Sequence, residues 1–191
     1  MFTWRDFKIK KNISKYYFKN IMKVMSNIQL NKALNKKNLN LYFTLHHKLK
    51  KYIEEILKKT SKLNKLIKFI EENKIFECLS KTNLVISDFS SVIFDIIYRR
   101  KPFIIYIPDI EDPQIKDLYT NDYYELIQSI RNGTVEFENK FFSVNESVNK
   151  IIYYINNNFS LEPKLEKFYN NFEFQRGKFL NLFVNYLKNL N

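Results

Sequence analysis

The chain has 191 residues and a mass of 23.3 kDa, which suits one domain with a short helical appendage. Apolar residues make up 45 % and aromatic residues 17 %, so the chain can bury a core and does not have the composition of a disordered protein. Its two glycines, Gly133 and Gly177, exclude glycine-rich dinucleotide and Walker A loops, because each of these needs several glycines in one turn. The single Cys78 excludes an internal disulfide and a cysteine-rich zinc module.

The formal net charge is +12, and two interpretations of it stay open. The lysines come with abundant Asn and Ile, which indicates a compositional bias and a solvated basic surface. Alternatively, the charge serves an anionic partner such as a nucleotide, an acidic polymer or the negative face of a membrane. No motif favours nucleic acid. No apolar stretch reaches the roughly 20 residues of a membrane span, and no apolar segment of a signal peptide follows Met1–Asp6. We expect a cytoplasmic protein, with peripheral contact at the inner face of the cell membrane as an alternative.

The first half of the chain alternates helical and strand patterns. Apolar residues at a period close to 3.6 predict one amphipathic helix over 13–34. A strand is predicted at 39–45, and helical spacing returns over 48–59. A second strand is predicted at 66–70, followed by a short helix around 76–79.

The middle of the chain predicts a parallel sheet. The apolar run 84–87 is typical of a buried strand, and it ends at Asp88–Ser91, where a helix begins. After Pro102, residues 103–107 form another continuous apolar strand. Strands that are apolar on both faces and alternate with helices indicate an α/β fold, Rossmann-like, with helices on both faces of a parallel sheet.

The last third has a different pattern. Residues 115–131 read as a helix and 133–137 as a turn with a short strand. The sequence Ser143–Glu146 is a capping box, which predicts a helix from there to about residue 158. A final helix is predicted over 175–190.

The candidate site lies after the strand at 84–87. In open α/β sheets, ligands bind outside the carboxyl ends of the strands, and Asp88–Ser91 has that position. The unpaired N–H groups of the following helix, with the hydroxyls of Ser90 and Ser91, would form an anion site. The alternative is that Ser90 or Asp88 only caps the helix. Local spacing does not decide between them.

The wider context of these residues resembles a known family. The segment 82–95 reads TNLVISDFSSVIFD, and it is followed by KPFIIY at 101–106. This block resembles the CDP-glycerol:poly(glycerophosphate) glycerophosphotransferase family, the teichoic-acid polymerases, which carry aDvlItDYSSviFDf…kPiifY. Here Phe89 replaces a tyrosine of that pattern, Ser87 a threonine and Asn83 an aspartate.

Two shorter matches lie upstream. Leu45–His47 follows a strand as the family's lHP element does, with His47 in the proline position. Thr3–Arg5 is similar to the end of the family's PTWR element, with Phe2 where proline is usual. The resemblance is good over about residues 1–110 and loose beyond them, where the family's acidic, glycine-rich segment and its arginine near the C-terminus are not matched.

The resemblance implies a fold and a set of partners. It implies the C-terminal, donor-binding half of a two-domain GT-B transferase, with residues 1–140 as the nucleotide-binding domain and 141–191 as a helical extension packed on it. The partners would be CDP-glycerol or a related CDP-alcohol and an acceptor glycopolymer of the cell envelope, with no nucleic acid. No metal or cofactor is expected. An upstream acceptor domain would be missing, so we expect a fragment, a truncated gene product or a donor domain that works with a partner chain.

The implied reaction transfers glycerol phosphate from CDP-glycerol to a polymer hydroxyl, and CMP leaves. Ser90 and Ser91 would hold the diphosphate. Asp88 would either fix the loop through backbone N–H groups or accept from a ribose or glycerol hydroxyl. Asp95 is either an acid favoured by the helix dipole or a ribose contact.

His46 is the candidate for acid–base chemistry or a phosphate contact, because its pKa range suits proton transfer near neutrality. His47 is expected to be a bystander. Arg5 would either face the phosphates or close the end of the sheet. Two other classes of function stay open: a non-catalytic domain that binds CDP-linked ligands without turnover, and a polyanion-binding surface module without preference for cytidine.

Overall fold

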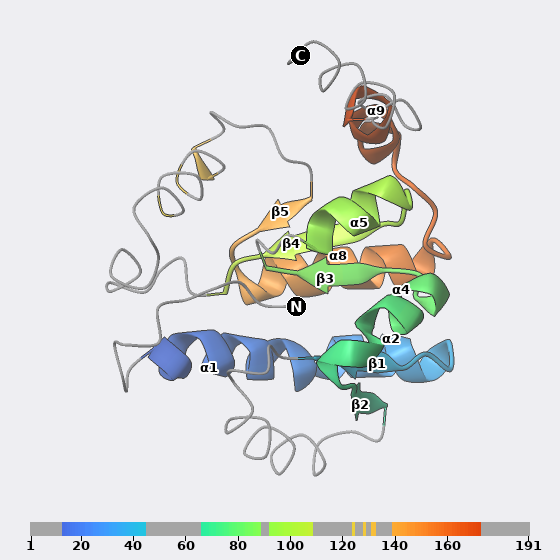
Figure 1. Ribbon diagram of the computed structural model, residues 1–191. Coiled ribbons are helices and arrows are strands. Elements are labelled where there is room, and N and C mark those ends of the chain that lie inside the picture. Colours follow the sequence, from blue (N-terminus) through green and yellow to red (C-terminus); the bar gives the residue numbers. More distant parts are fainter. Residues whose placement is uncertain are drawn as a thin grey trace.

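A computed structural model describes most of the central part of the chain, in which parallel strands are flanked by helices (Figure 1). The predicted helix at 48–59, the turn at 133–137 and the final helix at 175–190 lie outside the described residues, as does most of the helix at 115–131. The described residues are 13–44, 66–88, 92–108, 124, 128, 131–132 and 139–172.

All described strand pairs are parallel. The strand β1 (Leu41–Phe43) pairs with β2 (Ile67–Phe69). A second sheet has the order β3 (Val85–Ser87), β4 (Phe103–Tyr106), β5 (Lys140–Phe141). The predictions of β1, β2, β3 and β4 are confirmed, and so is the parallel α/β class. The strand β5 was not predicted.

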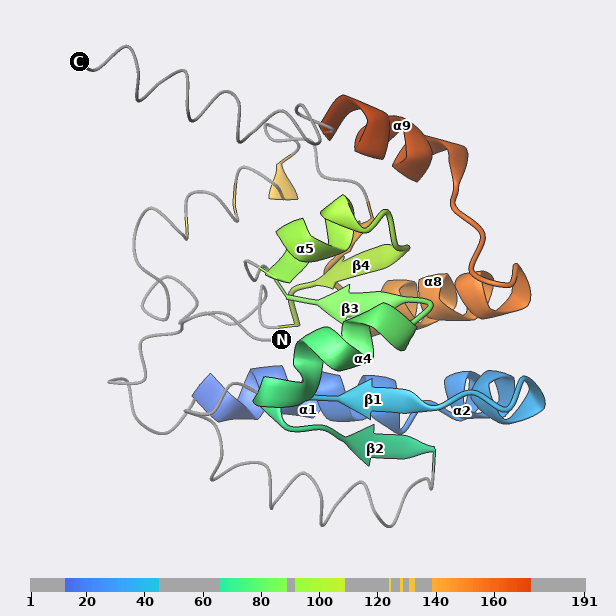
Figure 2. The same cartoon turned by 45° about the vertical axis from the view of Figure 1, so that its right-hand side comes forward.

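The two groups of strands lie side by side, with β1 next to β3 and the arrows of both pointing the same way (Figure 2). The strands therefore follow one another in the order β2, β1, β3, β4, β5. From β1 the chain continues to β2 on one side, whereas from β3 it continues to β4 on the other side. The point between β1 and β3 is the topological switch point, where open α/β sheets bind their ligands.

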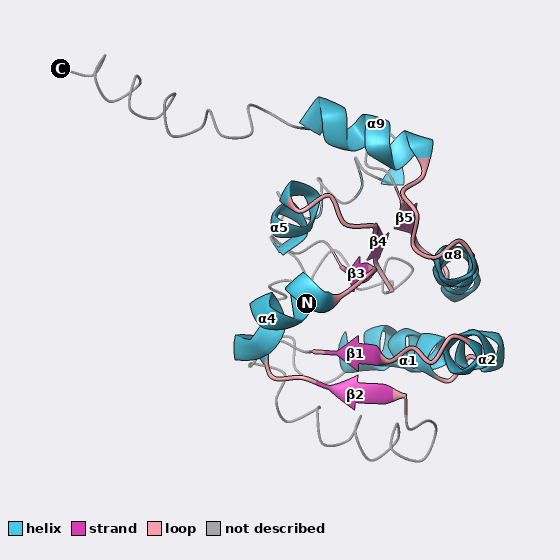
Figure 3. Ribbon diagram, turned by 90° about the vertical axis from the view of Figure 1, so that its right-hand side faces the viewer, coloured by secondary structure: helices cyan, strands magenta, loops and turns pink. Residues whose placement is uncertain are grey.

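Helices cover both faces of the strands (Figure 3), as the sequence predicts. Of the described helices, α4 (Ile75–Lys81), α5 (Val92–Tyr98) and α9 (Pro163–Phe172) lie on one face. A short 3₁₀ turn, Glu72–Lys74, leads into α4. The other face carries α1 (Ile13–Met25), α2 (Ile28–Lys36) and α8 (Val144–Asn156).

The strand β4 is the centre of the core, and all of its side chains are buried. Phe103 and Ile105 pack in the cluster under α4, α5 and α9, whereas Ile104 and Tyr106 pack in the cluster under α1, α2 and α8. Successive side chains of a strand point to opposite faces, so one continuous apolar run supplies both clusters.

The prediction of one helix over 13–34 is wrong, because the structure has two helices with a break at Asn27. The Asn27 backbone is extended, with φ −65° and ψ 122°, and its side-chain oxygen accepts a hydrogen bond from the Leu30 N–H at 3.0 Å. This N-cap begins α2. Apolar periodicity could not reveal the break, since Met25 and Leu30 on either side of it are buried in the same cluster.

The predicted capping box before α8 is confirmed. The Ser143 hydroxyl accepts from the Glu146 N–H at 3.2 Å, and the Glu146 carboxylate accepts from the Ser143 N–H at 3.3 Å. The sequence analysis did not predict α9, although Pro163 stands at its first position, where proline is favoured. The proposed division at residue 140 stays a prediction.

Aromatic packing and polar contacts attach α9 to β4. The ring centroid of Phe103 lies 6.0 Å from that of Phe168 and 6.1 Å from that of Tyr169. The Tyr169 hydroxyl donates to the carbonyl of Lys101. The Arg100 guanidinium lies 5.9 Å from the centre of the Tyr169 ring. These contacts fix α9 over the turn that leads into β4.

We expect the protein to lose stability as the pH rises above about 10. Burial raises the pKa of Tyr154 and of Tyr169 well above the ordinary value of 10.0. Above that value the unfolded chain releases these two protons while the folded chain keeps them. The stabilisation is therefore complete below pH 10 and is lost as the pH rises toward the folded pKa values. Denaturant unfolding followed by circular dichroism across alkaline pH measures the effect.

The variants Tyr154→Phe and Tyr169→Phe should each make this alkaline decline shallower, because phenylalanine has no proton to lose. Tyr98→Phe is the matched control, since Tyr98 is 63 % exposed. If the free energy of unfolding falls with pH as steeply in both of these variants as in the wild type, titration of the two buried tyrosines does not cause the loss.

Candidate functional site

The candidate site is the edge of the sheet at which the parallel strands end. After Phe43 the chain leaves β1 through Thr44, and after Ser87 it leaves β3 through Asp88. Both segments leave at the same edge, on the two sides of the switch point (Figure 2). The ends of β1 and β3 therefore lie at the place where open α/β sheets bind their ligands.

Two of the predicted site residues lie in the described part of the chain. Asp88 is 2 % exposed, directly after β3. A buried carboxylate is unfavourable unless hydrogen-bond donors surround it. Asp95 is exposed and lies in the first turn of α5. Four other predicted site residues lie outside the described residues, so how they come together stays a prediction: Arg5, His46, Ser90 and Ser91.

The structure adds Thr44 to the candidate residues. Its hydroxyl oxygen is buried and makes no hydrogen bond to any described residue. Thr44 lines a cavity of about 150 Å³ between β1, β3 and α4, together with Ile86 and Val92. In the sequence pattern, Thr44 is only part of a predicted strand. The sequence feature that could have indicated Thr44 is a polar residue at the carboxyl end of an apolar strand.

A second cavity of about 220 Å³ lies between the same two strands and extends toward their amino ends, where Asn38 and Asn83 line it. Both cavities are smaller than the roughly 300–1,000 Å³ of usual small-molecule sites. Neither is large enough to enclose a nucleotide. A ligand of that size would have to lie along the carboxyl edge and place only one part in the cavity beside Thr44.

Comparison with known proteins decides the family. The CDP-Glycerol:Poly(glycerophosphate) glycerophosphotransferase family matches residues 1–178. The chain belongs to this family. The resemblance drawn from the block at 82–95 is thereby confirmed.

One similar relative is the minor teichoic acid biosynthesis protein GgaB of Bacillus subtilis (strain 168). It is 27 % identical over 157 residues, which is 82 % of this chain and 16 % of GgaB. The chain thus spans less than a fifth of the length of that relative. No solved structure matches this chain.

The structure separates the two parts of the glycerophosphotransferase block. Asp88, which follows β3 in the first part, lies at the carboxyl edge. Lys101, which begins the second part, lies at the opposite end, where its ammonium group donates to the carbonyls of Ser80 and Thr82. The Val85 N–H also donates to the Pro102 carbonyl at 3.1 Å. The lysine and proline of this family block therefore hold the entry to β3 and β4 and do not face the candidate site.

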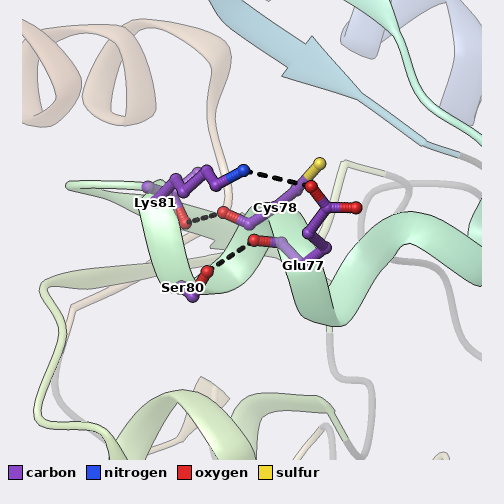
Figure 4. Close-up of polar contacts among 5 residues, drawn as sticks. Glu77, Cys78, Ser80 and Lys81 are labelled. Atoms are coloured by element: carbon purple, nitrogen blue, oxygen red, sulfur yellow. Dashed lines mark hydrogen bonds and ion pairs between the residues drawn. The ribbon is translucent and has the colours of Figure 1, made fainter.

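The polar contacts around Cys78 also have a structural role (Figure 4). The ammonium group of Lys81 lies 3.0 Å from the Glu77 carboxylate, and this hydrogen bond raises the pKa of Lys81. The Ser80 hydroxyl donates to the Glu77 carbonyl at 2.6 Å, and the Thr82 hydroxyl donates to the Cys78 carbonyl at 3.2 Å. These contacts complete the end of α4, and the Cys78 sulfur takes part in none of those drawn.

Two features are absent from the part of the chain that the structure describes. No three His, Cys, Asp or Glu side chains of this part of the chain lie together as a metal site would require. None of the described helices combines the length and the apolar character that crossing a membrane would need.

Proposed function

We propose that this chain is the donor-binding part of a glycerophosphotransferase, which binds CDP-glycerol and transfers glycerol phosphate to a hydroxyl of a cell-envelope polymer such as teichoic acid. The proposal rests mainly on the position in the fold of the family block at 82–95. The segment that begins at Ser87 leaves β3 at the carboxyl edge, beside the end of β1. This is the place where an open α/β sheet binds its ligand. The name of GgaB, a minor teichoic acid biosynthesis protein, supports the class of acceptor.

The proposed reaction is a displacement at phosphorus. The acceptor hydroxyl oxygen attacks the β-phosphorus of CDP-glycerol and forms a new P–O bond. The bond from this phosphorus to the bridging oxygen breaks, and CMP leaves with the electron pair. His46 takes the proton of the acceptor hydroxyl as general base. This role is proposed because His46 follows, by two residues, Thr44, through which the chain leaves β1 at the candidate edge.

The other candidates have proposed roles in holding the donor. Ser90 and Ser91 donate hydrogen bonds to the diphosphate. The burial of Asp88 supports the positioning role, in which its carboxylate orders the loop, because a buried anion beside a diphosphate would repel it. Asp95 is exposed and accepts from a ribose hydroxyl. Arg5 faces the phosphates and offsets their charge.

The proposal also includes the surroundings of the chain. A GT-B arrangement requires a second half that binds the acceptor, contributed by the same polypeptide or by a partner. The reaction would take place at the cytoplasmic face of the membrane, because CDP-activated donors and a growing envelope polymer meet there.

We expect calorimetric titration to show that the protein binds CDP and CDP-glycerol in preference to ADP and GDP. The expectation follows from the family match and from the site at the ends of β1 and β3. Equal binding of all four nucleotides, or no binding of CDP, would overturn the proposed function.

The double variant Ser90→Ala, Ser91→Ala tests the proposed role of the two serines in the same titration. It should weaken CDP binding while circular dichroism shows a folded protein, and the free energy of unfolding should fall by only about 1 kcal/mol, the usual effect of a lost helix cap. A double variant that loses stability but binds CDP as tightly as the wild type would show that the two serines are structural.

A further inference from the structure

The positive charge of the protein is concentrated in one stretch of sequence. Residues 7–53 contain twelve lysines and no aspartate or glutamate. Of the 32 Lys and Arg residues, this leaves 20 for the rest of the chain, which also holds all 20 Asp and Glu residues. The whole formal charge of +12 therefore belongs to this stretch, and the remainder is neutral. A general compositional bias toward lysine would not give such a distribution.

The described part of this stretch includes α1 and α2, whose described lysine side chains are exposed. The apolar sides of both helices face the core, where Tyr17 and Leu30 are buried. The lysine row, as we name it, consists of the exposed lysines of these helices and of the residue that ends α2: Lys19, Lys23, Lys32, Lys36 and Lys37. None of the five has an ion pair with a described residue, and Lys37 donates to the Asn158 side chain at 3.4 Å.

The neighbouring helix does not neutralise this charge. α8 packs beside α1 and α2 on the same face of the strands (Figure 3). Glu146 is its acidic residue, and its carboxylate is held in the capping box by Ser143. The other exposed side chains of α8 are mostly asparagine. Lysines spaced four residues apart, as Lys19 and Lys23 are, repel one another. An anionic partner would remove this repulsion.

The lysine row begins near the candidate site and leads away from it. The Asn20 side chain donates to the carbonyl of Pro108 at 2.6 Å, so α1 is attached to the carboxyl end of β4. α2 ends where the chain enters β1 at its amino end. Figure 1 shows α1 and α2 following one another along the same layer. The lysine row thus extends over both helices, from Lys19 in α1 to Lys36 at the end of α2.

We propose that the lysine row binds the phosphodiester backbone of the acceptor polymer and holds the part of the polymer that trails behind the reacting end. This inference rests on the proposed function. A polymer with one phosphate in each repeat is complementary in charge and in shape to a linear row of lysines that starts at the reaction edge. A membrane-binding helix, in contrast, would show an apolar stripe beside its lysines. Here the apolar stripes are buried, and Ile28 is the one large apolar side chain of α2 that is strongly exposed, at 70 %.

Binding of synthetic poly(glycerol phosphate) chains of increasing length to the full chain tests this inference. The triple variant Lys23→Gln, Lys32→Gln, Lys36→Gln should bind a long chain about tenfold more weakly at low salt, since each exposed contact contributes little by itself. Its affinity should also depend less on salt concentration. The matched control removes the same charge elsewhere on the exposed surface: Lys74→Gln, Lys164→Gln, Lys167→Gln.

The expected result is length-dependent binding that the first variant weakens and the control variant retains. Equal losses in both variants would overturn the inference, because net charge alone would then explain binding. Equally tight binding of phosphatidylglycerol vesicles, or of a single-stranded oligonucleotide of matched charge, through the same lysines would also overturn it. CDP-glycerol titration of the same samples distinguishes a failure of this inference from a failure of the proposed function. If the protein binds CDP-glycerol but does not prefer the polymer, only the inference about the lysine row is contradicted.

Discussion

Replacing His46 by alanine should lower the rate of glycerol phosphate transfer by roughly 10²–10⁴-fold, the usual effect of losing a general acid or base. The assay needs an enzyme that contains this chain together with an acceptor-binding half. His46 lies two residues beyond Thr44, whose buried hydroxyl lines the cavity at the end of β1. A side chain from this loop would reach the space between the ends of β1 and β3. Turnover with CDP-glycerol and an acceptor polymer measures the effect.

His47→Ala is the matched control, and it should reduce turnover far less. The family has a proline at this position, and proline has no group that transfers protons. CDP-glycerol affinity should remain near the wild-type value in both variants, because the proposed role of His46 is in the transfer step. Equal losses of turnover, or a larger loss for His47→Ala, would show that the wrong histidine has been placed in the site. Donor binding without any transfer by the wild type would favour a non-catalytic domain.

Phe103→Ala should lower the free energy of unfolding by about 3–5 kcal/mol, the range for truncating a buried phenylalanine. Phe103 is completely buried in β4, with the rings of Phe168 and Tyr169 against it. Removal of its ring leaves a cavity between β4 and α9 that the surrounding strands and helices cannot fill. Denaturant unfolding followed by circular dichroism gives the value.

Phe76→Ala makes the same chemical change on the surface of α4, where the side chain is 60 % exposed. It should change the free energy of unfolding by no more than about 0.5 kcal/mol. Similar values for the two substitutions would contradict the packing of α9 on β4. A large loss for Phe103→Ala alone is the result that the packing of this ring between β4 and its helices predicts.

The sequence predicts the middle of the fold well because burial on two faces leaves a pattern there. Residues 103–107 are apolar without interruption, and the structure buries alternate members of this run in two different clusters. The two-residue strand β5 has no such pattern. Its position depends on pairing with β4, in which the Ile105 N–H donates to the Asn139 carbonyl at 2.9 Å. Such short strands are determined by tertiary contacts rather than by local composition.

The candidate site is predictable to a smaller extent. A polar residue after an apolar run marks the end of a strand, and Asp88 does lie there. The sequence could not indicate that Asp88 would be buried, since the local pattern is the same for an exposed and for a buried aspartate after a strand. Thr44 was missed for a related reason, because threonine is common within strands and its hydroxyl becomes distinctive only when it faces a cavity.

The separation of β1–β2 from β3–β5 affects how the molecule can deform. In the described backbone, these strands form two hydrogen-bonded groups, and β1 and β3 contribute to a shared apolar cluster. A ladder fixes two strands to a definite register, whereas packed side chains permit small sliding movements. Among the described strands, the boundary between β1 and β3, at the switch point, therefore deforms most easily. A ligand that contacted the chain beyond both β1 and β3 would link the two groups of strands. The stiffness of the strands as a whole would then depend on whether the ligand is bound.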